Sequence, residues 1–493
     1  MTRLGRAGLD DLPASVARPG YDPAAHAAGI VHLGCGAFHR AHQAVYTDAA
    51  LARSGGDWRI TAVSLRSTEI ADALNPQDGL YTLVEAGPEG QRARVIGSIA
   101  RVLAGSREPQ AILDALAAAA TRIVTITVTE KAYGIDRRAG EVDPSHPSVA
   151  ADLADPRAPT GVLGLLVEGL RRRFEAGLRP FTVLCCDNLP HNGALVRMGV
   201  VGLARRIDPA LAERIEREVA FPSSMVDRIT PAPNDATLGA AERLTGRTDR
   251  AAVETEPFSQ WVIEDRFPTG RPDWEAGGAL FVEDVAPFEA MKLRMLNGAH
   301  SMLAYAGFLA GHVHVRDVMA DPALAGLVRR HLSAAAATLG TLGGIDLAAY
   351  AEALLQRFSN PAIAHATYQI AMDGTEKLPQ RIVAPAVDAL RAGQSLRPFA
   401  FAVAAWMRYC VGRTESGERY DLRDPRKALI EMAVRSGPRD AAALTVGLLA
   451  LPGLFPVELL GASRFVGDVE TILAGFLRDG AAATIAAEAG RVS

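Results

Sequence analysis

Lysine is scarce in this sequence. Of the 52 lysine and arginine residues, only Lys131, Lys292, Lys377 and Lys427 are lysines. Arginine therefore occupies almost every position where any surface cation would serve. A guanidinium stays protonated in proteins, whereas an ammonium can lose its proton. The few lysines are therefore candidates for sites that need an amine, and Lys292 lies in the chemically richest surroundings.

Cysteines and long apolar runs are also few. The four cysteines form no C-x-x-C pair, which argues against a zinc ribbon or a disulfide framework and fits a reducing compartment. The longest uncharged stretch, residues 441–457, is too short to span a bilayer and contains two prolines. The first residues lack the apolar segment of a signal peptide. We therefore expect a cytoplasmic protein without a membrane partner.

Net charge is low, and this bears on partners and class. The formal charge is −4, the pI is about 6.3, and no basic block alternates with aromatic residues. Nucleic acid is therefore not an expected partner. The 49% hydrophobic and 22% charged content is typical of a globular protein. Because 493 residues exceed the roughly 250–300 at which single cores stop growing, we expect at least two domains.

Apolar β-branched runs alternate with helical segments in the first half of the chain. Residues 29–33 predict a strand, and residues 37–52 predict a helix after a glycine turn. This alternation predicts an α/β fold with a largely parallel sheet covered on both faces. The sequence becomes mainly helical after Pro287, so we expect domains at 1–287 and 288–493, with a cleft near Lys292. The further predicted strands are 60–65, 123–129 and 181–185, and the predicted crossover helices include 111–120 and 162–176.

The glycine turn is a candidate dinucleotide site. Gly34 and Gly36 follow the first strand and let the backbone approach a pyrophosphate, while Ala37 and Phe38 open a helix with free N–H groups. His39 stands where a third glycine is usual, so a purely structural turn remains an alternative. Glu69, after the second strand, is placed to bind a ribose and favours NAD over NADP, although Arg66 leaves that preference open.

Residues 291–300 form the candidate catalytic centre. At 100° per residue, Lys292, Asn297 and His300 fall at about 0°, 140° and 80° and span about 12 Å along a helix. The helix dipole and partial burial would lower the pKa of Lys292, making it a general base. Asn297 and His300 could then hydrogen-bond the oxygen on which charge develops. A helix with solvated lysine and histidine is the alternative.

Two further segments carry polar residues. Asn188 lies in the loop Cys186–Gly193, which suits a ligand at a strand end or an ordinary turn. Asp227 suits either an ion pair with Arg228 or a substrate contact.

His39 and His42 have no carboxylate or cysteine nearby to complete a zinc set, so no metal is expected.

These residues together resemble the polyol-specific long-chain dehydrogenases, the family of mannitol 2-dehydrogenase and fructuronate reductase. The resemblance runs through residues 32–42, 186–193, 221–231, 292–300 and 373–377. It implies a Rossmann-type domain followed by a helical domain, and zinc-independent chemistry with NAD. It also implies that Lys292 is the general base, that Asn297 and His300 polarise the reacting oxygen, and that Asn188, Asp227 and Lys377 line the site.

Within the family, the substrate depends on a few positions. Mannitol-type members carry an arginine eight residues before the lysine of the Asp-Gly motif, where this chain has Gln369. Gln369, Arg381 and the segment containing Lys131 look more like the hexuronate branch. Lys131 could bind a substrate carboxylate, although pairing with Glu130 or simple exposure is an equal alternative.

The expected function is therefore the reversible, NAD(H)-dependent interconversion of D-fructuronate and D-mannonate. Oxidation of mannitol or another polyol by the same residues is the nearest alternative. A non-catalytic, nucleotide-dependent sugar sensor is a remote one. The expected partner is a small sugar acid or polyol; the sequence leaves the oligomeric state open, and a monomer is compatible with it.

Overall fold

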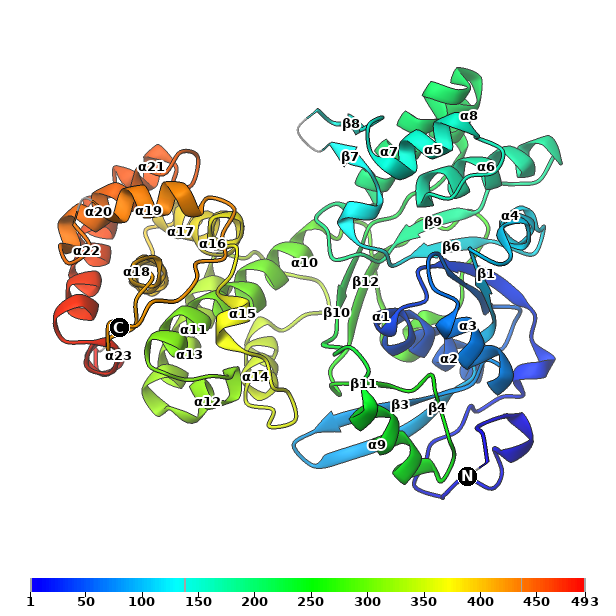
Figure 1. Cartoon of the computed structure of the whole chain (residues 1–493), viewed down its shortest axis with the longest axis horizontal. Coiled ribbons are helices and arrows are strands. Elements are labelled where there is room, and N and C mark those ends of the chain that lie inside the picture. Colours follow the sequence, from blue (N-terminus) through cyan, green and yellow to red (C-terminus); the bar gives the residue numbers. More distant parts are fainter. Residues whose placement is uncertain (1, 137–138, 436, 492–493) are drawn as a thin grey trace. The chain divides into compact units, whose positions relative to one another are not determined.

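The computed structural model describes residues 2–136, 139–435 and 437–491. The chain forms two compact units, Met1–Ala286 and Pro287–Ser493. All strands within the described residues lie in the first unit, and the second unit is helical. The ribbon in Figure 1 follows both units from the blue amino end to the red carboxyl end.

A five-stranded parallel sheet organises the first unit. Its order is β5-β2-β1-β6-β9, and each neighbouring pair is parallel. The chain thus adds β2 and β5 on one side of β1, and then returns to add β6 and β9 on the other side. This reversal is a topological switch point between β1 and β6, where open α/β sheets bind ligands at the carboxyl ends of their strands. The strands are β1 Ala28–Leu33, β2 Arg59–Ser64, β5 Ile99–Ala104, β6 Ile123–Ile126 and β9 Thr182–Cys185.

Helices cover both faces of this sheet. Alternate strand residues point to opposite sides, so Val31 and Val183 join one apolar cluster while Ile30 and Leu184 join another. Full burial of each such side chain contributes about 1.5–3 kcal/mol. The predicted α/β class with a largely parallel, two-sided sheet is confirmed. The first unit's helices are α1 Ala37–Ala41, α2 Gln43–Ser54, α3 Glu69–Leu74, α4 Pro109–Ala117, α5 Pro147–Ala154, α6 Val162–Glu175, α7 Asn192–Ile207, α8 Pro209–Glu218 and α9 Asp235–Thr245.

Smaller sheets extend the first unit. One has the order β10-β12-β13, another has the order β11-β3-β4, and β7 pairs with β8. Sequence analysis did not predict them, because most of their strands are short and lack a continuous apolar run. Their bounds are β3 Tyr81–Gly87, β4 Gly90–Ile96, β7 Ile135–Asp136, β8 Glu141–Val142, β10 Ser224–Asp227, β11 Val253–Thr255, β12 Gln260–Glu264 and β13 Leu280–Val282.

The second unit packs its helices around α18, which is buried along most of its length. Aspartate side chains cap several helices: Asp321 and Asp346 each accept two backbone N–H groups of the following turn, an arrangement that contributes about 1 kcal/mol per helix. Helix α10 (Ala286–Met291) begins at the division between the units. The other helices are η6 Lys292–Asn297, α11 Gly298–Leu309, α12 Val315–Ala320, α13 Pro322–Ala337, α14 Leu347–Phe358, α15 Thr367–Ile370, α16 Gly374–Leu378, η7 Pro379–Val383, α17 Ala384–Arg391, α18 Arg397–Cys410, α19 Lys427–Arg435, α20 Ala441–Leu449, α21 Val457–Leu460, α22 Ser463–Arg478 and α23 Ala481–Ala489.

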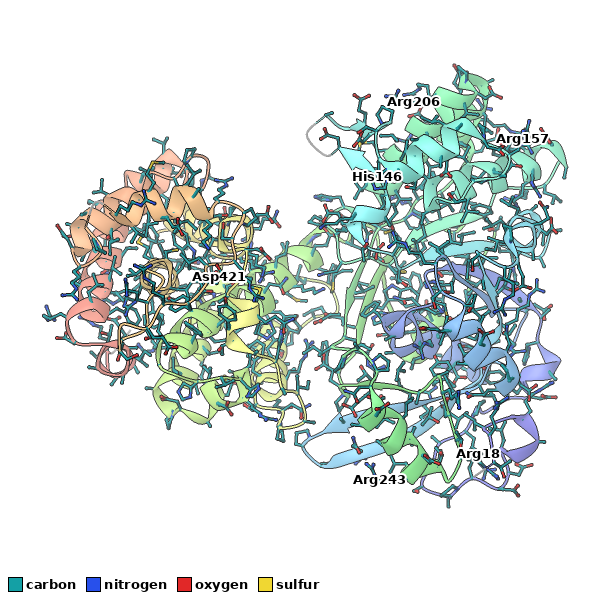
Figure 2. The ribbon with its side chains drawn as sticks, in the orientation of Figure 1. Arg18, His146, Arg157, Arg206, Arg243 and Asp421 are labelled. Atoms are coloured by element: carbon teal, nitrogen blue, oxygen red, sulfur yellow. The ribbon has the colours of Figure 1, made fainter. Side chains whose placement is uncertain are left out.

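Arginines and carboxylates alternate on the surface. Figure 2 labels Arg18, Arg157 and Arg206 among the outward side chains. They pair with Asp10 at 3.0 Å, Glu168 at 3.8 Å and Glu141 at 3.2 Å, respectively. These arginines are thus neutralised locally. Among the described residues, none of the helices has the length and apolar character needed to cross a bilayer.

Candidate active site

The glycine turn lies at the switch point. Gly34 follows β1 with a φ of +102°, and a side chain there would bring its Cβ to 1.9 Å from the backbone oxygen of Thr127, just beyond β6. Thr127 in turn donates its backbone N–H to the oxygen of Leu33 at 2.9 Å. Only glycine fits this position, because both the backbone angle and the close approach exclude a Cβ.

Gly36 has a different role. It precedes α1 with an ordinary φ of −84°, it is exposed, and a Cβ there would meet only the oxygen of Gly34, at 3.8 Å. The protein itself therefore does not require glycine at this position. The missing side chain leaves open space beside the backbone of Ala37 and Phe38, which fits the approach of a phosphate group.

The helix after this turn is shorter than predicted. Residues 37–52 were expected to be one helix, but α1 ends at Ala41 and α2 begins at Gln43. The backbone of His42 departs from helical angles (φ −126°, ψ −92°), and its ring approaches the backbone oxygen of Gln260 at 3.0 Å. A tertiary contact thus interrupts the local helical preference. A helix of five residues has only a small dipole, so free backbone N–H groups are the main attraction for an anion here.

His39 occupies the position of the third glycine by stacking on His32. The two rings lie 3.4 Å apart between centroids and are nearly parallel, at 11°. Burial lowers the pKa of His32 to about 3 and holds the pKa of His39 well below its ordinary value. Both imidazoles are therefore neutral. Within the described residues, groups of three or more potential metal ligands are absent.

Glu69 is exposed at the start of α3, five residues beyond the end of β2. Its backbone N–H donates to the Ser67 hydroxyl at 3.1 Å, which fixes the entry into the helix. Arg66 is exposed in the same loop. A carboxylate and a guanidinium are thus both accessible after β2, and the assignment of Glu69 to the ribose stays a prediction.

The ends of β9 and β10 bring the second group of polar residues together. The Asn192 amide donates to the backbone oxygens of Asp187 at 2.9 Å and Ser224 at 2.8 Å. This links the loop carrying Asn188, which is exposed, to the strand ending at Asp227, which is buried. The two predicted residues therefore lie on neighbouring segments, one after β9 at the edge of the five-stranded sheet and one at the end of β10 in a smaller sheet.

Asp187 joins this edge to the loop after β6. Its carboxylate accepts the Tyr133 hydroxyl at 2.6 Å and the Val128 N–H at 3.2 Å. Burial raises the pKa of Asp187 to about 6. Lys131, in the same loop, is exposed. Tyr133 and Asp187 thus hold the segment that carries Lys131, and sequence analysis missed both roles because nothing local marks this long-range contact.

Arg228, next to Asp227, fixes this strand from inside. Its guanidinium donates to the backbone oxygens of Ala41 at 2.7 Å and Glu256 at 3.0 Å, and to the carboxylate of Glu85 at 2.5 Å. The expected pair of Asp227 with Arg228 stays a prediction. The three contacts give Arg228 a structural role in connecting β10 to α1 and β3.

Lys292 begins a π-helix, which corrects the predicted geometry. Lys292, Asn297 and His300 were expected to lie on one regular α-helix, but η6 (Lys292–Asn297) is a π-helix between α10 and α11. In a π-helix the hydrogen bond joins residues five apart, so Asn297 follows Lys292 by about one turn. The predicted separation of 140° is therefore wrong, and the two side chains are brought nearer to one face.

The environment of Lys292 also differs from expectation. The continuous helical segment begins at Ala286, so Lys292 lies beyond the first turn, where the helix dipole has little effect. That part of the argument for an activated amine is wrong. Burial remains, because only 7% of the residue is exposed. Desolvation favours the neutral form of a lysine, and this is the surviving physical reason for a base at this position.

A second π-helix packs against the first. This second π-helix is η7 (Pro379–Val383). A Cβ added to Gly298 would lie only 2.8 Å from the backbone oxygen of Arg381 in η7. Gly298 thus permits the two segments to meet. The Arg381 guanidinium then donates to the Ser301 hydroxyl at 3.2 Å. Such π-helical turns are frequent at functional sites.

His300 lies among rings and cations. Its ring is 4.6 Å from that of Phe358 and 5.5 Å from that of His365, between centroids. Burial, followed by the neighbouring His365, Arg357 and Arg381, holds the pKa of His300 well below its ordinary value. A neutral imidazole can donate one hydrogen bond and accept another. Sequence analysis missed His365, because no local motif surrounds it.

Lys377 is half-buried in the same unit. Its ammonium donates to the backbone oxygens of Met372 at 2.6 Å and Ile370 at 3.3 Å, and Asp373 lies 3.7 Å away. Burial, followed by the charge of Arg381, lowers the pKa of Lys377. Gln369, in α15, is exposed. The structure thus brings two cations, Lys377 and Arg381, near the neutral His300, with Gln369 at the surface.

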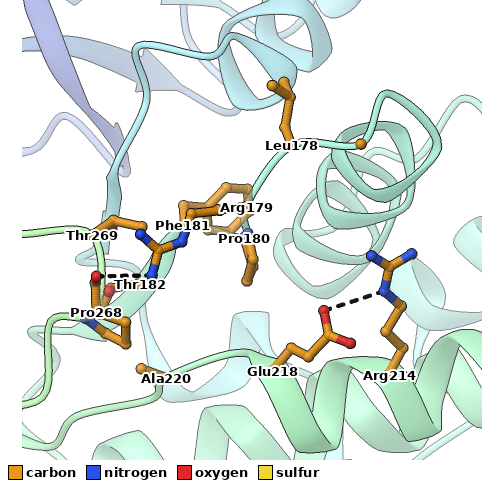
Figure 3. A pocket seen from close by; sticks show the side chains of 11 residues that line it. Leu178, Arg179, Pro180, Phe181, Thr182, Arg214, Glu218, Ala220, Pro268 and Thr269 are labelled. Atoms are coloured by element: carbon orange, nitrogen blue, oxygen red, sulfur yellow. Dashed lines mark hydrogen bonds and ion pairs between the residues drawn. The ribbon is translucent and has the colours of Figure 1, made fainter.

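A cavity of about 340 Å³ in the first unit lies elsewhere. Figure 3 shows Arg179 directed toward Pro268, and Arg214 beside Glu218 at the cavity's rim. Thr182, the first residue of β9, lines it, so the cavity lies at the opposite end of this strand from Asn188. It is separate from the switch point.

The fold and these clusters define a class: a dinucleotide-binding type of α/β unit followed by a helical unit that carries a buried lysine. Residues 28–276 match the mannitol dehydrogenase Rossmann domain, and residues 284–474 match the mannitol dehydrogenase C-terminal domain. The chain belongs to the mannitol dehydrogenase family, and it is a dehydrogenase.

Three relatives illustrate the similarity. D-mannonate oxidoreductase of Escherichia coli (strain K12) is 44% identical, over 96% of this chain and 98% of that protein. The structure of Pseudomonas fluorescens mannitol 2-dehydrogenase in a ternary complex with NAD and D-mannitol is 38% identical, with a TM-score of 0.81 and full coverage of both chains. A substrate-free D-sorbitol dehydrogenase is 35% identical, with a TM-score of 0.91, over 98% of this chain and 100% of that chain.

Proposed function

We propose that this protein uses NAD(H) to interconvert D-fructuronate and D-mannonate. The observation that carries the proposal is the pair of partly buried cations Lys377 and Arg381 beside the neutral His300. Burial lowers the pKa of both cations, so their charged forms lack solvent stabilisation. Asp373, 3.7 Å from Lys377, balances one of these two cations, and a substrate carboxylate would balance the other. A neutral polyol would not.

The division of labour between the two units follows from their clusters. The residues around the turn fit the cofactor: Gly34 shapes the turn, Gly36 leaves room for the pyrophosphate, Ala37 and Phe38 offer backbone N–H groups, and Glu69 binds the ribose. Residues 1–287 are thus the dinucleotide-binding domain, and residues 288–493 are the substrate domain. The nicotinamide supplies the hydride when the ketone is reduced.

Lys292 supplies the proton. In reduction its ammonium gives a proton to the oxygen of the 2-keto group, and in oxidation its amine takes a proton from the corresponding hydroxyl. Ketone, reduced cofactor and one proton thus become alcohol and oxidised cofactor. Asn297 and the neutral His300 hydrogen-bond the reacting oxygen, which stabilises the charge that develops on it. No zinc is needed, because the lysine performs the proton transfer.

The remaining residues position the substrate. Asn188 and Asp227 address its hydroxyl groups, and Lys131, Lys377, Arg381 and Gln369 address its carboxylate end. The protein is proposed to work in the cytoplasm on a small-molecule substrate. Oxidation of mannitol to fructose is the second candidate, supported by 38% identity to a mannitol 2-dehydrogenase over the full chain.

A substrate panel tests this proposal. Purified protein should be assayed at 340 nm with mannonate, altronate, mannitol and arabinitol, using NAD and NADP separately. The proposal predicts the highest kcat/KM with mannonate and NAD. Turnover of mannitol far above mannonate would reject the hexuronate assignment and favour the second candidate.

A pair of lysine variants sharpens the test. Lys377→Met should lower kcat/KM for the acid substrate by about tenfold or more, because a charge-assisted hydrogen bond to the carboxylate is lost. Lys427→Met is the matched control, since 44% of the Lys427 side chain is exposed and its ammonium pairs with Asp421 at 2.6 Å. Equal effects of the two substitutions would remove the assignment of Lys377 to the carboxylate.

A further inference from the structure

A second cavity, of about 380 Å³, lies within the helical unit. It is formed by α13, α18, α22 and the end of the chain around α23, all of which are labelled in Figure 1. Its volume lies within the range of small-molecule sites, about 300–1,000 Å³. None of its lining residues belongs to the proposed catalytic or substrate-binding set.

Arginine dominates the polar lining of this cavity. Arg330, Arg397, Arg464 and Arg491 line it, against only two carboxylates, Asp468 and Glu488. The lining therefore has an excess of two positive charges. In a chain with a net charge of −4, an excess of two guanidinium charges in one cavity indicates an anionic occupant.

The contacts show which of these arginines are already used. Arg397 binds the Glu488 carboxylate with two nitrogens, at 2.9 and 2.7 Å, and also pairs with Asp468. Arg330 donates to the backbone oxygens of Glu488, at 2.8 Å, and Ala489. These two arginines hold the carboxyl end of α23 in place and make the cavity wall rigid.

The other two arginines retain donors for a ligand. Arg491 contacts Glu488 through Nε at 3.2 Å, which leaves its terminal nitrogens available. Arg464 makes no hydrogen bond or ion pair within residues 2–136, 139–435 and 437–491. The planar forks of such side chains match the oxygens of a phosphate group.

The floor of the cavity is apolar. Leu327 and Phe401 line it and are 7% and 3% exposed, and Pro398 lines it beside them. A ligand that carried only charge would leave this surface unused. A ring or short apolar body attached to the anion would cover it.

We propose that this cavity binds a small organic phosphate monoester, with the phosphate at Arg464 and Arg491 and an apolar or ring-shaped body over Leu327, Pro398 and Phe401. A monoester carries close to two negative charges near neutral pH, which matches the excess of positive charge. The site is additional to the dinucleotide turn and does not depend on the proposed reaction.

Phenyl phosphate is a suitable probe, because it combines a phosphate with a ring. It should be titrated calorimetrically into the full-length protein saturated with NADH, so that the dinucleotide turn is already filled. Inorganic phosphate and phenol are the partial probes. The proposal predicts that phenyl phosphate binds more tightly than either, since only it uses both the arginines and the floor.

Two arginine variants locate the binding. Arg464→Gln should weaken phenyl phosphate binding by about tenfold or more. Arg439→Gln is the matched control, an exposed arginine of the same unit outside the cavity, and it should leave binding unchanged. Each variant's melting temperature should equal that of the unsubstituted protein, because neither arginine makes a hydrogen bond or ion pair within the described residues.

Three outcomes would overturn the proposal. The first is no binding heat from phenyl phosphate up to millimolar concentration. The second is an Arg464→Gln variant that binds phenyl phosphate as well as the unsubstituted protein does. The third is an equal loss of binding in both variants. The comparison of variants remains decisive even if NADH fails to bind, because it reports on the cavity alone.

Discussion

The two glycines of the nucleotide turn should respond in opposite ways to the same substitution. In Gly34→Ala the new Cβ would lie 1.9 Å from the Thr127 oxygen, at a φ of +102°. In Gly36→Ala the Cβ would have no atom closer than 3.8 Å, at an ordinary φ of −84°. The first substitution should therefore damage the fold, and the second should damage the cofactor site.

The magnitudes follow from these contacts. An unfavourable backbone conformation costs about 1–3 kcal/mol, and forcing a methyl group against fixed backbone adds about 1–3 kcal/mol. Gly34→Ala should thus lose about 2–6 kcal/mol, which corresponds to a fall in Tm of roughly 4–20 °C. Gly36→Ala should change stability by less than about 0.5 kcal/mol. A methyl group beneath the pyrophosphate should instead weaken NADH binding by about 5- to 150-fold.

Differential scanning calorimetry measures the first effect, and NADH fluorescence titration measures the second. For Gly36→Ala, kcat at saturating NADH should stay near that of the unsubstituted protein, because the reacting groups are untouched. Normal NADH affinity in Gly36→Ala would show that the turn does not face the cofactor. Normal stability in Gly34→Ala would show that the turn geometry is wrong.

Three further substitutions test other parts of the account. Tyr133→Phe removes the hydroxyl that donates to the buried Asp187 carboxylate at 2.6 Å, and it should lower the calorimetric free energy of unfolding by about 1–3 kcal/mol. Tyr368→Phe is the control, because the Tyr368 hydroxyl donates to the backbone oxygen of Asp421, and it should cost less. Equal losses in the two variants would contradict this prediction. Gly298→Ala places a Cβ 2.8 Å from the backbone oxygen of Arg381. It should lower kcat/KM about 5- to 150-fold and leave the affinity for NADH unchanged. An unchanged kcat/KM would refute the close contact between the two π-helical segments. His331 is buried, and burial lowers its pKa to about 4. Because the unfolded chain takes up this proton near pH 6.5, His331 alone should contribute a loss of stability of up to about 1.4 kcal/mol per pH unit as the pH falls from 6.5 to 4. In denaturant titrations, His331→Phe should reduce the pH slope of stability by that amount.

The sequence predicts the central sheet well, because its strands are buried on both faces. Val31 and Ile30 face opposite sides, and both are apolar, so β1 appears as an apolar run that is interrupted by the buried His32. The short strands of the smaller sheets carry no such signal. The break at His42 and the π-helix at Lys292 were also beyond local patterns, since both accompany contacts with distant segments, at Gln260 and Arg381.

The candidate site was predictable only in part, for the same reason. Lys292, Asn297 and His300 share one segment, so their proximity follows from the chain itself. His365 and Arg381 reach His300 from other segments, and Tyr133 reaches Asp187 across two strands. The helix dipole was assigned to Lys292 because the start of its helix was placed too late, and the structure leaves burial as the reason for an available amine.

The most direct test of the account is the turnover of Lys292→Ala beside its affinity for NADH. The account predicts that kcat/KM for fructuronate falls by about a hundred- to ten-thousand-fold while the Kd for NADH stays constant, because general acid catalysis is lost and the dinucleotide turn is intact. Lys427→Ala should match the unsubstituted protein in both measurements. Unchanged turnover in Lys292→Ala would contradict the assignment of proton transfer to this lysine.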